Sequence, residues 1–229
     1  VIINLAAEHR DDVTPRSLYD EVNVQGAKNV CAAAERNYID TIVFTSSVAV
    51  YGFAPVGTDE TGEIHYFNDY GRTKSEAEKV YRAWFEKDPE HRKLVIVRPT
   101  VVFGEQNRGN VYNLLEQISS SVFMMVGSGN NIKSMAYVEN VAAFLEYTLS
   151  FDRGFYLYNY VDKPDFDMNA LVKTVYDQLG RKPLIRLHLP YWMGYAGGKL
   201  FDLLALISQK KFTISSIRIK KFCENTCFN

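Results

Sequence analysis

The sequence has few cysteines, no marked excess of charge of either sign and few long apolar runs. Its 229 residues include three cysteines, Cys31, Cys223 and Cys227, which are too few for a disulfide framework. The Cys223 and Cys227 spacing lacks the paired His or Cys residues that would complete a zinc site. We therefore expect reduced thiols in a cytoplasmic protein and no metal site.

The charges are balanced, with 26 Lys and Arg residues against 27 Asp and Glu residues. Such a chain has no global field that would draw it to nucleic acid, so a small molecule is the expected partner. The longest apolar stretch, residues 191–207, contains Lys199, Asp202 and three glycines. It therefore falls short of a membrane-spanning helix.

An initiator methionine, a polar leader and a signal peptide are absent from the start of the sequence. The sequence opens on the apolar run Val1–Ala7, so we expect it to begin inside a domain. A G-x-G-x-x-G or G-x-x-G-x-x-G turn between a strand and a helix, which would cradle a pyrophosphate, is also missing.

Three continuous runs of β-branched and apolar residues predict buried parallel strands, namely Val1–Leu5, Thr41–Phe44 and Leu94–Val97. Apolar residues recur near the 3.6-residue period in Pro15–Asn37 and in Asp69–Phe85, which predicts a helix in each. Strands that alternate with helices in this way indicate βαβ units and an α/β fold with a parallel sheet.

Shorter elements follow residue 99 and indicate a smaller lobe that packs on the sheet. The expected helices cover residues 110–120, 139–149, 169–179 and 190–208, and the expected strands cover residues 123–126, 155–160 and 184–188.

Tyr70 and Lys74 stand at i and i+4, which places a phenol and an ammonium on one helix face. A cation beside the phenolate favours its ionised form, and a pKa drop of about three units corresponds to ~4 kcal/mol. Ser47 follows a predicted strand at its carboxyl end, where open α/β sheets bind ligands. The same spacing recurs at Tyr195 and Lys199 without such a strand, so we interpret that second instance as structural.

Five motifs occur in one order along the chain: Asn4–Ala7, Asn23–Gly26, Thr45–Gly52, Tyr70–Lys74 and Arg98–Gly104. In this order the sequence resembles the extended short-chain dehydrogenase/reductase family, the NAD-dependent epimerases and dehydratases, from the fourth strand onward. The resemblance implies a doubly wound, Rossmann-like sheet without its N-terminal part and a small α+β substrate lobe. Residues 1–105 would be the partial NAD-binding domain, and residues 106–229 mainly the substrate lobe, with some segments returning to the core.

The resemblance also implies roles for single residues. Tyr70 would remove a proton from a sugar hydroxyl while hydride passes to NAD. Lys74 would hold the nicotinamide ribose and lower the pKa of Tyr70, and Ser47 would bind the reacting oxygen. The further cofactor-binding positions are Leu5, Ala6 and Ala7 beside the cofactor and Ser46, Pro99 and Thr100 around the nicotinamide. The substrate-binding positions are Ser47, Ala49, Lys133 and Asn110, which would begin a helix facing the substrate diphosphate.

Two departures from the family pattern bear on the reaction. Val48 and Ala49 stand where the dehydratases carry an Asp-Glu pair, which disfavours dehydration. Lys133 and Ser134 stand where nucleotide-sugar epimerases carry an Arg-Asp pair, which weakens the case for a UDP-sugar and mildly favours a lipid-linked diphosphate. A solvated surface position for Lys133 remains the equal alternative.

Residues 7–13, 108–113 and 134–140 further resemble family members that act on a lipid-linked N-acetylhexosamine. The function implied is an NAD-dependent 4-epimerase of a polyprenyl- or UDP-linked N-acetylhexosamine in surface polysaccharide biosynthesis. The alternatives are a nucleotide-sugar reductase or dehydrogenase and a non-catalytic dinucleotide-binding protein.

Three expectations concern the whole chain. Because the glycine-rich turn is missing, these residues alone should bind NAD poorly and be inactive, and the choice of NAD over NADP stays open. The helices at 15–37 and 69–85 resemble the pair through which family members form homodimers. The apolar helix at 190–208, followed by Lys210 and Lys211, either packs in the lobe or makes peripheral contact with the inner face of the membrane.

Overall fold

The computed structural model describes residues 1–10, 13–120, 123–181, 188–208 and 215–229. The chain divides into two compact units. The first unit comprises residues 1–104, 135–163 and 228–229, and the second comprises residues 105–134 and 164–227. The chain passes from one unit to the other after Gly104, Ser134, Lys163 and Cys227.

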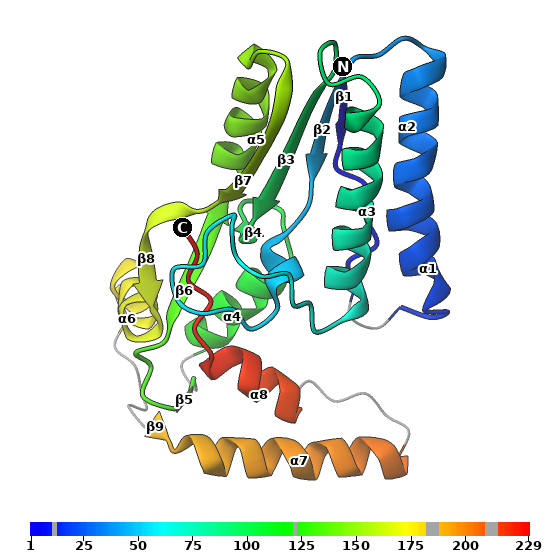
Figure 1. The fold of residues 1–229 in the computed structure, drawn as a ribbon. Helices are drawn as coiled ribbons and strands as arrows, with labels where there is room; N and C mark the ends of the chain where they lie inside the picture. The colour runs from blue at the N-terminus through cyan, green and yellow to red at the C-terminus, as the bar shows by residue number, and fades with distance from the viewer. Residues whose placement is uncertain (11–12, 121–122, 182–187, 209–214) are drawn as a thin grey trace. The chain divides into compact units, whose positions relative to one another are not determined.

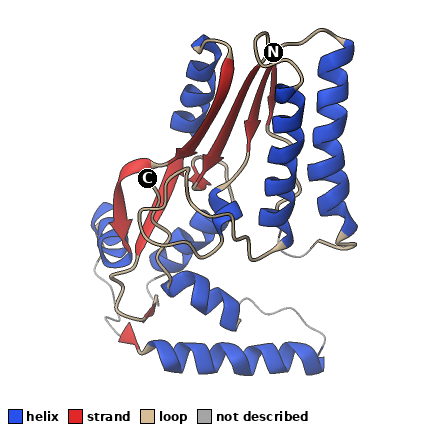
Figure 2. Ribbon diagram, in the orientation of Figure 1, coloured by secondary structure: helices blue, strands red, loops and turns tan. Residues whose placement is uncertain are grey.

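A four-stranded parallel sheet forms the centre of the first unit (Figures 1 and 2). Its strands are β1 (Ile2–Asn4), β2 (Thr41–Thr45), β3 (Lys93–Pro99) and β7 (Gly154–Tyr160), in the spatial order β1-β2-β3-β7. All three pairings are parallel, with Ile42 opposite Leu94 and Leu94 opposite Phe155. The three apolar runs therefore do form parallel strands, and the predicted α/β class is confirmed.

Helices cover both faces of this sheet. Ile42, Phe44 and Ile96 belong to one core, against α2 (Gly26–Arg36) and α3 (Asp69–Glu86). Val43, Val95 and Val97 point to the other face and join a second core with Val141 and Leu145 of α5 (Val138–Tyr147). Successive residues of a strand face opposite sides, so each buried strand supplies both cores.

The helix predicted over residues 15–37 changes its helix type along its length. It begins as α1 (Ser17–Tyr19), continues as the π-helical segment η1 (Asp20–Gln25), and ends as α2. A π-helical turn carries one residue more than an α-helical turn, and such turns are frequent at functional sites.

The remaining elements are shorter. In the first unit the 3₁₀ helix η2 (Val48–Tyr51) follows β2, β4 (Val101–Phe103) pairs in parallel with the end of β6 (Ile132–Tyr137), and η3 (Thr148–Ser150) follows α5. The others are α4 (Asn110–Ser119), β5 (Met125–Val126), β8 (Asp162–Asp167), α6 (Met168–Gln178), β9 (His188–Leu189), α7 (Tyr191–Ser208) and α8 (Ser216–Cys223). Residues 184–187 of the strand predicted at 184–188 lie outside the described residues, and His188 begins β9, which pairs with β5. Within the described residues, none of the helices combines the length and the apolar character needed to cross a bilayer.

Candidate active site

Ser47 and Tyr70 are brought together by the two helix starts that follow β2. The hydroxyl of Ser47 caps η2 by accepting a hydrogen bond from the Ala49 amide at 3.2 Å. Asn68 caps α3 by accepting one from the Gly71 amide at 2.9 Å. A Cβ atom at Gly71 would lie 2.4 Å from the Ala49 carbonyl oxygen, so only glycine lets α3 approach η2 this closely.

Tyr70, Ser47 and Lys74 form one group at the carboxyl end of β2. The Ser47 side chain lies close enough to the Tyr70 phenol to lower its pKa. The Lys74 Nζ atom lies 5.9 Å from the centre of the Tyr70 ring and 4.7 Å from that of Phe44. It donates a 2.7 Å hydrogen bond to the Thr45 carbonyl, and Lys74 is only 2% exposed. The arrangement is that of an acid/base hydroxyl with a hydroxyl partner and an adjacent cation.

The expected depression of the Tyr70 pKa is not found. Burial raises the pKa of the Tyr70 phenol above its usual value, and Ser47 opposes this shift only in part. Burial also lowers the pKa of Lys74 to about 8, against the opposing charge of Glu78. The structure therefore stabilises neither the phenolate nor the ammonium fully, because desolvation disfavours both charged forms.

A buried ion pair beneath this group was not anticipated from the sequence. Arg98 at the end of β3 donates two hydrogen bonds to the carboxylate of Glu78 on α3, at 2.9 and 2.5 Å. The same carboxylate accepts a 2.5 Å hydrogen bond from the Ser46 hydroxyl, and Arg98 also donates to the Tyr51 hydroxyl at 2.6 Å. Glu78 stands one helical turn after Lys74, so this network ties α3 to both central strands.

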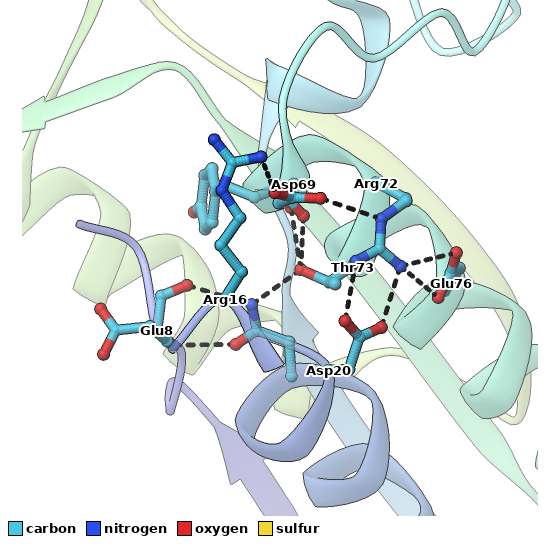
Figure 3. A network of polar contacts seen from close by, with 9 residues as sticks. Glu8, Arg16, Asp20, Asp69, Arg72, Thr73 and Glu76 are labelled. Atoms are coloured by element: carbon cyan, nitrogen blue, oxygen red, sulfur yellow. Dashed lines mark hydrogen bonds and ion pairs between the residues drawn. The ribbon is translucent and has the colours of Figure 1, made fainter. Parts of the chain in front are cut away.

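A second network holds the first turn of α3 against the π-helical segment (Figure 3). Arg72 binds both carboxylate oxygens of Asp20, at 2.9 and 2.8 Å, and also contacts Glu76. Asn23, buried in η1, donates to the Thr73 hydroxyl at 2.9 Å and exchanges two hydrogen bonds with the backbone of Glu8. Asn23 is thus a structural link between the segment after β1 and α3.

The predicted cofactor positions lie at the carboxyl ends of three neighbouring strands. Leu5 and Ala6 are exposed directly after β1, and the small side chain of Ala6 leaves the backbone there open to close approach. Pro99 ends β3 and Thr100 follows it, and the Thr100 amide donates to the Tyr160 carbonyl at 3.0 Å. Among the described residues, the buried hydroxyls of Thr45 and Thr100 have no hydrogen-bond partner. Unpaired buried hydroxyls are uncommon, and these two at one edge of the sheet fit a polar cofactor.

The predicted substrate positions of the second unit have different outcomes. Asn110 is exposed and begins α4, as the sequence predicted. The Lys133 amine instead donates to the carbonyls of Lys221, at 2.9 Å, and Glu224, at 2.6 Å, around the end of α8. Burial lowers the pKa of Lys133 to about 8. Its amine thus stabilises a helix terminus, and neither the diphosphate contact nor the solvated surface position describes it.

Comparison with known proteins identifies a family with which this chain shares its sequence. Residues 1–156 match the model of the NAD dependent epimerase/dehydratase family. The whole chain is 54% identical to N-acetyl-alpha-D-glucosaminyl-diphospho-ditrans,octacis-undecaprenol 4-epimerase of Escherichia coli O157:H7 and covers 69% of that protein. With 93% of its length, the chain is 30% identical to UDP-glucose 4-epimerase of Vibrio cholerae and covers 67% of it.

Solved structures agree on the fold. The UDP-glucuronic acid 4-epimerase of Bacillus cereus in complex with NAD superposes with a TM-score of 0.71 at 18% identity, over 81% of this chain and 61% of that chain. The chain thus spans about two thirds of the length of these relatives.

Proposed function

The chain belongs to the NAD-dependent epimerase/dehydratase family, and from this premise we propose that it carries the catalytic group of a sugar 4-epimerase. Its substrate is an N-acetylhexosamine on a diphosphate, with a polyprenyl carrier favoured over UDP. The 54% identity to an epimerase of an undecaprenyl-linked sugar supports that carrier. The observation that carries the proposal is the convergence of Ser47, Tyr70 and Lys74 at the end of β2.

Bound NAD supplies the chemistry of accepting a hydride from the sugar carbon and returning it to the opposite face. Tyr70 takes the proton of the sugar hydroxyl and later returns it, which requires the phenolate in the first step. Burial opposes that phenolate, whereas Ser47 favours it, and the Lys74 amine lies beside the ring. Ser47 also orients the reacting oxygen. Val48 and Ala49 offer no proton-transferring side chain, so the keto sugar is not dehydrated.

The cellular location that we propose follows from the proposed substrate. A lipid-linked N-acetylgalactosamine would begin a surface polysaccharide, so the enzyme works in the cytoplasm at the inner face of the membrane, with peripheral contact to it. The pairing of α2 with α3 in the first unit suits the homodimer that the sequence resemblance implies.

The test uses the full-length protein with polyprenyl-diphosphate-linked and UDP-linked N-acetylglucosamine. We expect the galacto epimer to form without net NADH. Tyr70→Phe should reduce turnover by about 10²- to 10⁴-fold, the usual contribution of a general acid/base. Tyr195→Phe changes the other Tyr-x-x-x-Lys pair, in α7, and should leave turnover unchanged. Consumption of external NADH would indicate a reductase, and conversion of neither substrate would refute the proposal.

A further inference from the structure

Helix α7 of the second unit turns its small and polar residues inward. A Cβ atom at Gly198 would lie 2.7 Å from the Cα atom of Ser216, so glycine is needed for α8 to pack this closely. The carboxylate of Asp202 accepts a 2.5 Å hydrogen bond from the Ser216 hydroxyl. Gly194 is likewise buried, against Val126. The face of α7 that packs on its own unit is therefore centred on small and polar residues, with the half-buried Tyr195 and Phe201 on either side of them.

The large apolar side chains of α7 form one exposed stripe instead. Trp192 is 69% exposed, Leu203 52%, Leu206 77% and Ile207 72%, and Leu200 lies between them at 57%. Their spacing places them on one side of a helix that is about 27 Å long. This distribution is the reverse of that in an ordinary surface helix, whose apolar stripe faces the core. Figure 1 shows α7 (orange) beside α8 (red).

The sequence around this stripe is strongly basic. Residues 191–223 contain six basic residues, Lys199, Lys210, Lys211, Arg218, Lys220 and Lys221, but only one acidic residue, Asp202. The carboxylate of Asp202 is turned to Ser216. The segment therefore carries a net charge of +5 in a chain whose net charge is −1. Lys199 lies on α7 itself, and the other five basic residues follow α7 in the sequence. Basic residues close to an exposed apolar helix face favour binding to anionic lipid.

We propose that the exposed stripe of α7 lies in the interface of an anionic lipid bilayer, with Trp192 and the leucines inserted below the headgroups. A second copy of this chain is a poorer occupant, because it would bring two +5 segments together. The purpose that we assign to this docking, access to a polyprenyl-linked sugar, rests on the proposed function. Binding to the bilayer can be measured without any measurement of turnover.

The experiment compares sedimentation of the full-length protein with vesicles of phosphatidylcholine and of phosphatidylcholine with phosphatidylglycerol. We expect binding to the anionic vesicles that weakens as salt is raised. Leu203→Glu with Ile207→Glu should weaken it by at least about tenfold. Tyr38→Glu is the matched control, because Tyr38 is 95% exposed in the first unit, and it should bind like the unchanged protein.

Trp192 gives a readout that does not depend on the folding of a variant in which the stripe is charged. Its emission, taken as the difference between the protein and Trp192→Phe, should shift to shorter wavelength with anionic vesicles. Absence of both vesicle binding and this shift would overturn the inference. A second result would also overturn it: the unchanged protein does not bind vesicles, and the Leu203→Glu, Ile207→Glu variant has a lower Tm or an altered oligomeric state. That result would mean that another segment or a second copy of the chain covers the stripe. Vesicle binding without conversion of either sugar would refute the proposed function alone.

Discussion

Lys74 is a buried cation that the fold stabilises only in part. Burial lowers its pKa from an ordinary value of 10.5 to about 8, a shift equivalent to about 3 kcal/mol. Because its pKa is depressed, this cost to folding is fully present below about pH 8 and disappears as the pH rises from about 8 to 10.5.

We expect Lys74→Met to raise the free energy of unfolding at pH 7 by about 1–2 kcal/mol, since the lost hydrogen bond to Thr45 offsets part of the gain. The gain in the free energy of unfolding should shrink as the pH rises toward 10.5. We also expect the variant to have no turnover. Chemical denaturation at pH 7 and pH 10 measures both values. Lys79→Met, on the exposed face of the same helix, should show neither effect. A variant that is less stable than the unchanged protein at pH 7 would contradict this account.

For the buried pair of Glu78 and Arg98 we predict the opposite effect, a fall in the free energy of unfolding. Glu78→Gln leaves the Arg98 guanidinium buried without a counter-charge, and such losses cost about 3–5 kcal/mol. Glu86→Gln removes the partner of Arg82 in an exposed pair of α3, where the cost should be below about 1 kcal/mol. Thermal and denaturant unfolding compare the two variants, and equal losses would refute a special role for the buried pair.

The sequence could point to a candidate catalytic group but not to the residues that support it. Ser47, Tyr70 and Lys74 belong to a motif with its own spacing, whereas Glu78 and Arg98 meet only when α3 crosses β3. One signal was available: Arg98 directly follows a run of four apolar strand residues, and a buried charge requires a partner. The partner itself is a matter of tertiary contact, as is the inward turn of Lys133 to the end of α8.

At the level of elements, the approach of α3 to η2 depends on Gly71. Gly71→Ala must move the first turn of α3 away from the Ala49 carbonyl, and with it Tyr70 from Ser47. We expect turnover to fall by more than about tenfold, because small misplacements of a catalytic group are costly. Stability should fall by about 1–3 kcal/mol.

Gly26→Ala is the matched control for this prediction. Gly26 begins α2 with helical dihedral angles, and no atom lies within 4 Å of the position its Cβ would take. Replacing it should stabilise the protein by about 0.5–1 kcal/mol and leave turnover intact. Unfolding and turnover measured on both variants test the pair, and full activity in Gly71→Ala would show that the close contact is dispensable.

Elements with strong periodicity were predictable and those made by tertiary context were not. The runs at 41–44 and 94–97 are β-branched and became central strands. By contrast, β8 has the sequence DKPDFD, whose charges and proline disfavour a strand by propensity. The π-helical turn of η1 has no pattern of its own, since its apolar spacing is that of the surrounding α-helix.

At the level of the whole molecule, the first unit brings Ser47, Tyr70 and Lys74 together, and these 229 residues contain no glycine-rich turn of the kind that binds a pyrophosphate. We expect the 229 residues to bind NAD at least about a hundredfold more weakly than a family member that carries this turn, which corresponds to about 2.7 kcal/mol. Calorimetric titration of both proteins with NAD measures the difference. Equal affinities would show that the strand ends of the first unit suffice.

The second unit is built from two excursions of the chain, which leave the first unit after Gly104 and Lys163. Neither excursion lies inside β1, β2, β3 or β7, so the register of the main sheet does not depend on their length. Insertions, deletions and substitutions could therefore accumulate in either excursion without disturbing the strands beside which Ser47, Tyr70 and Lys74 lie.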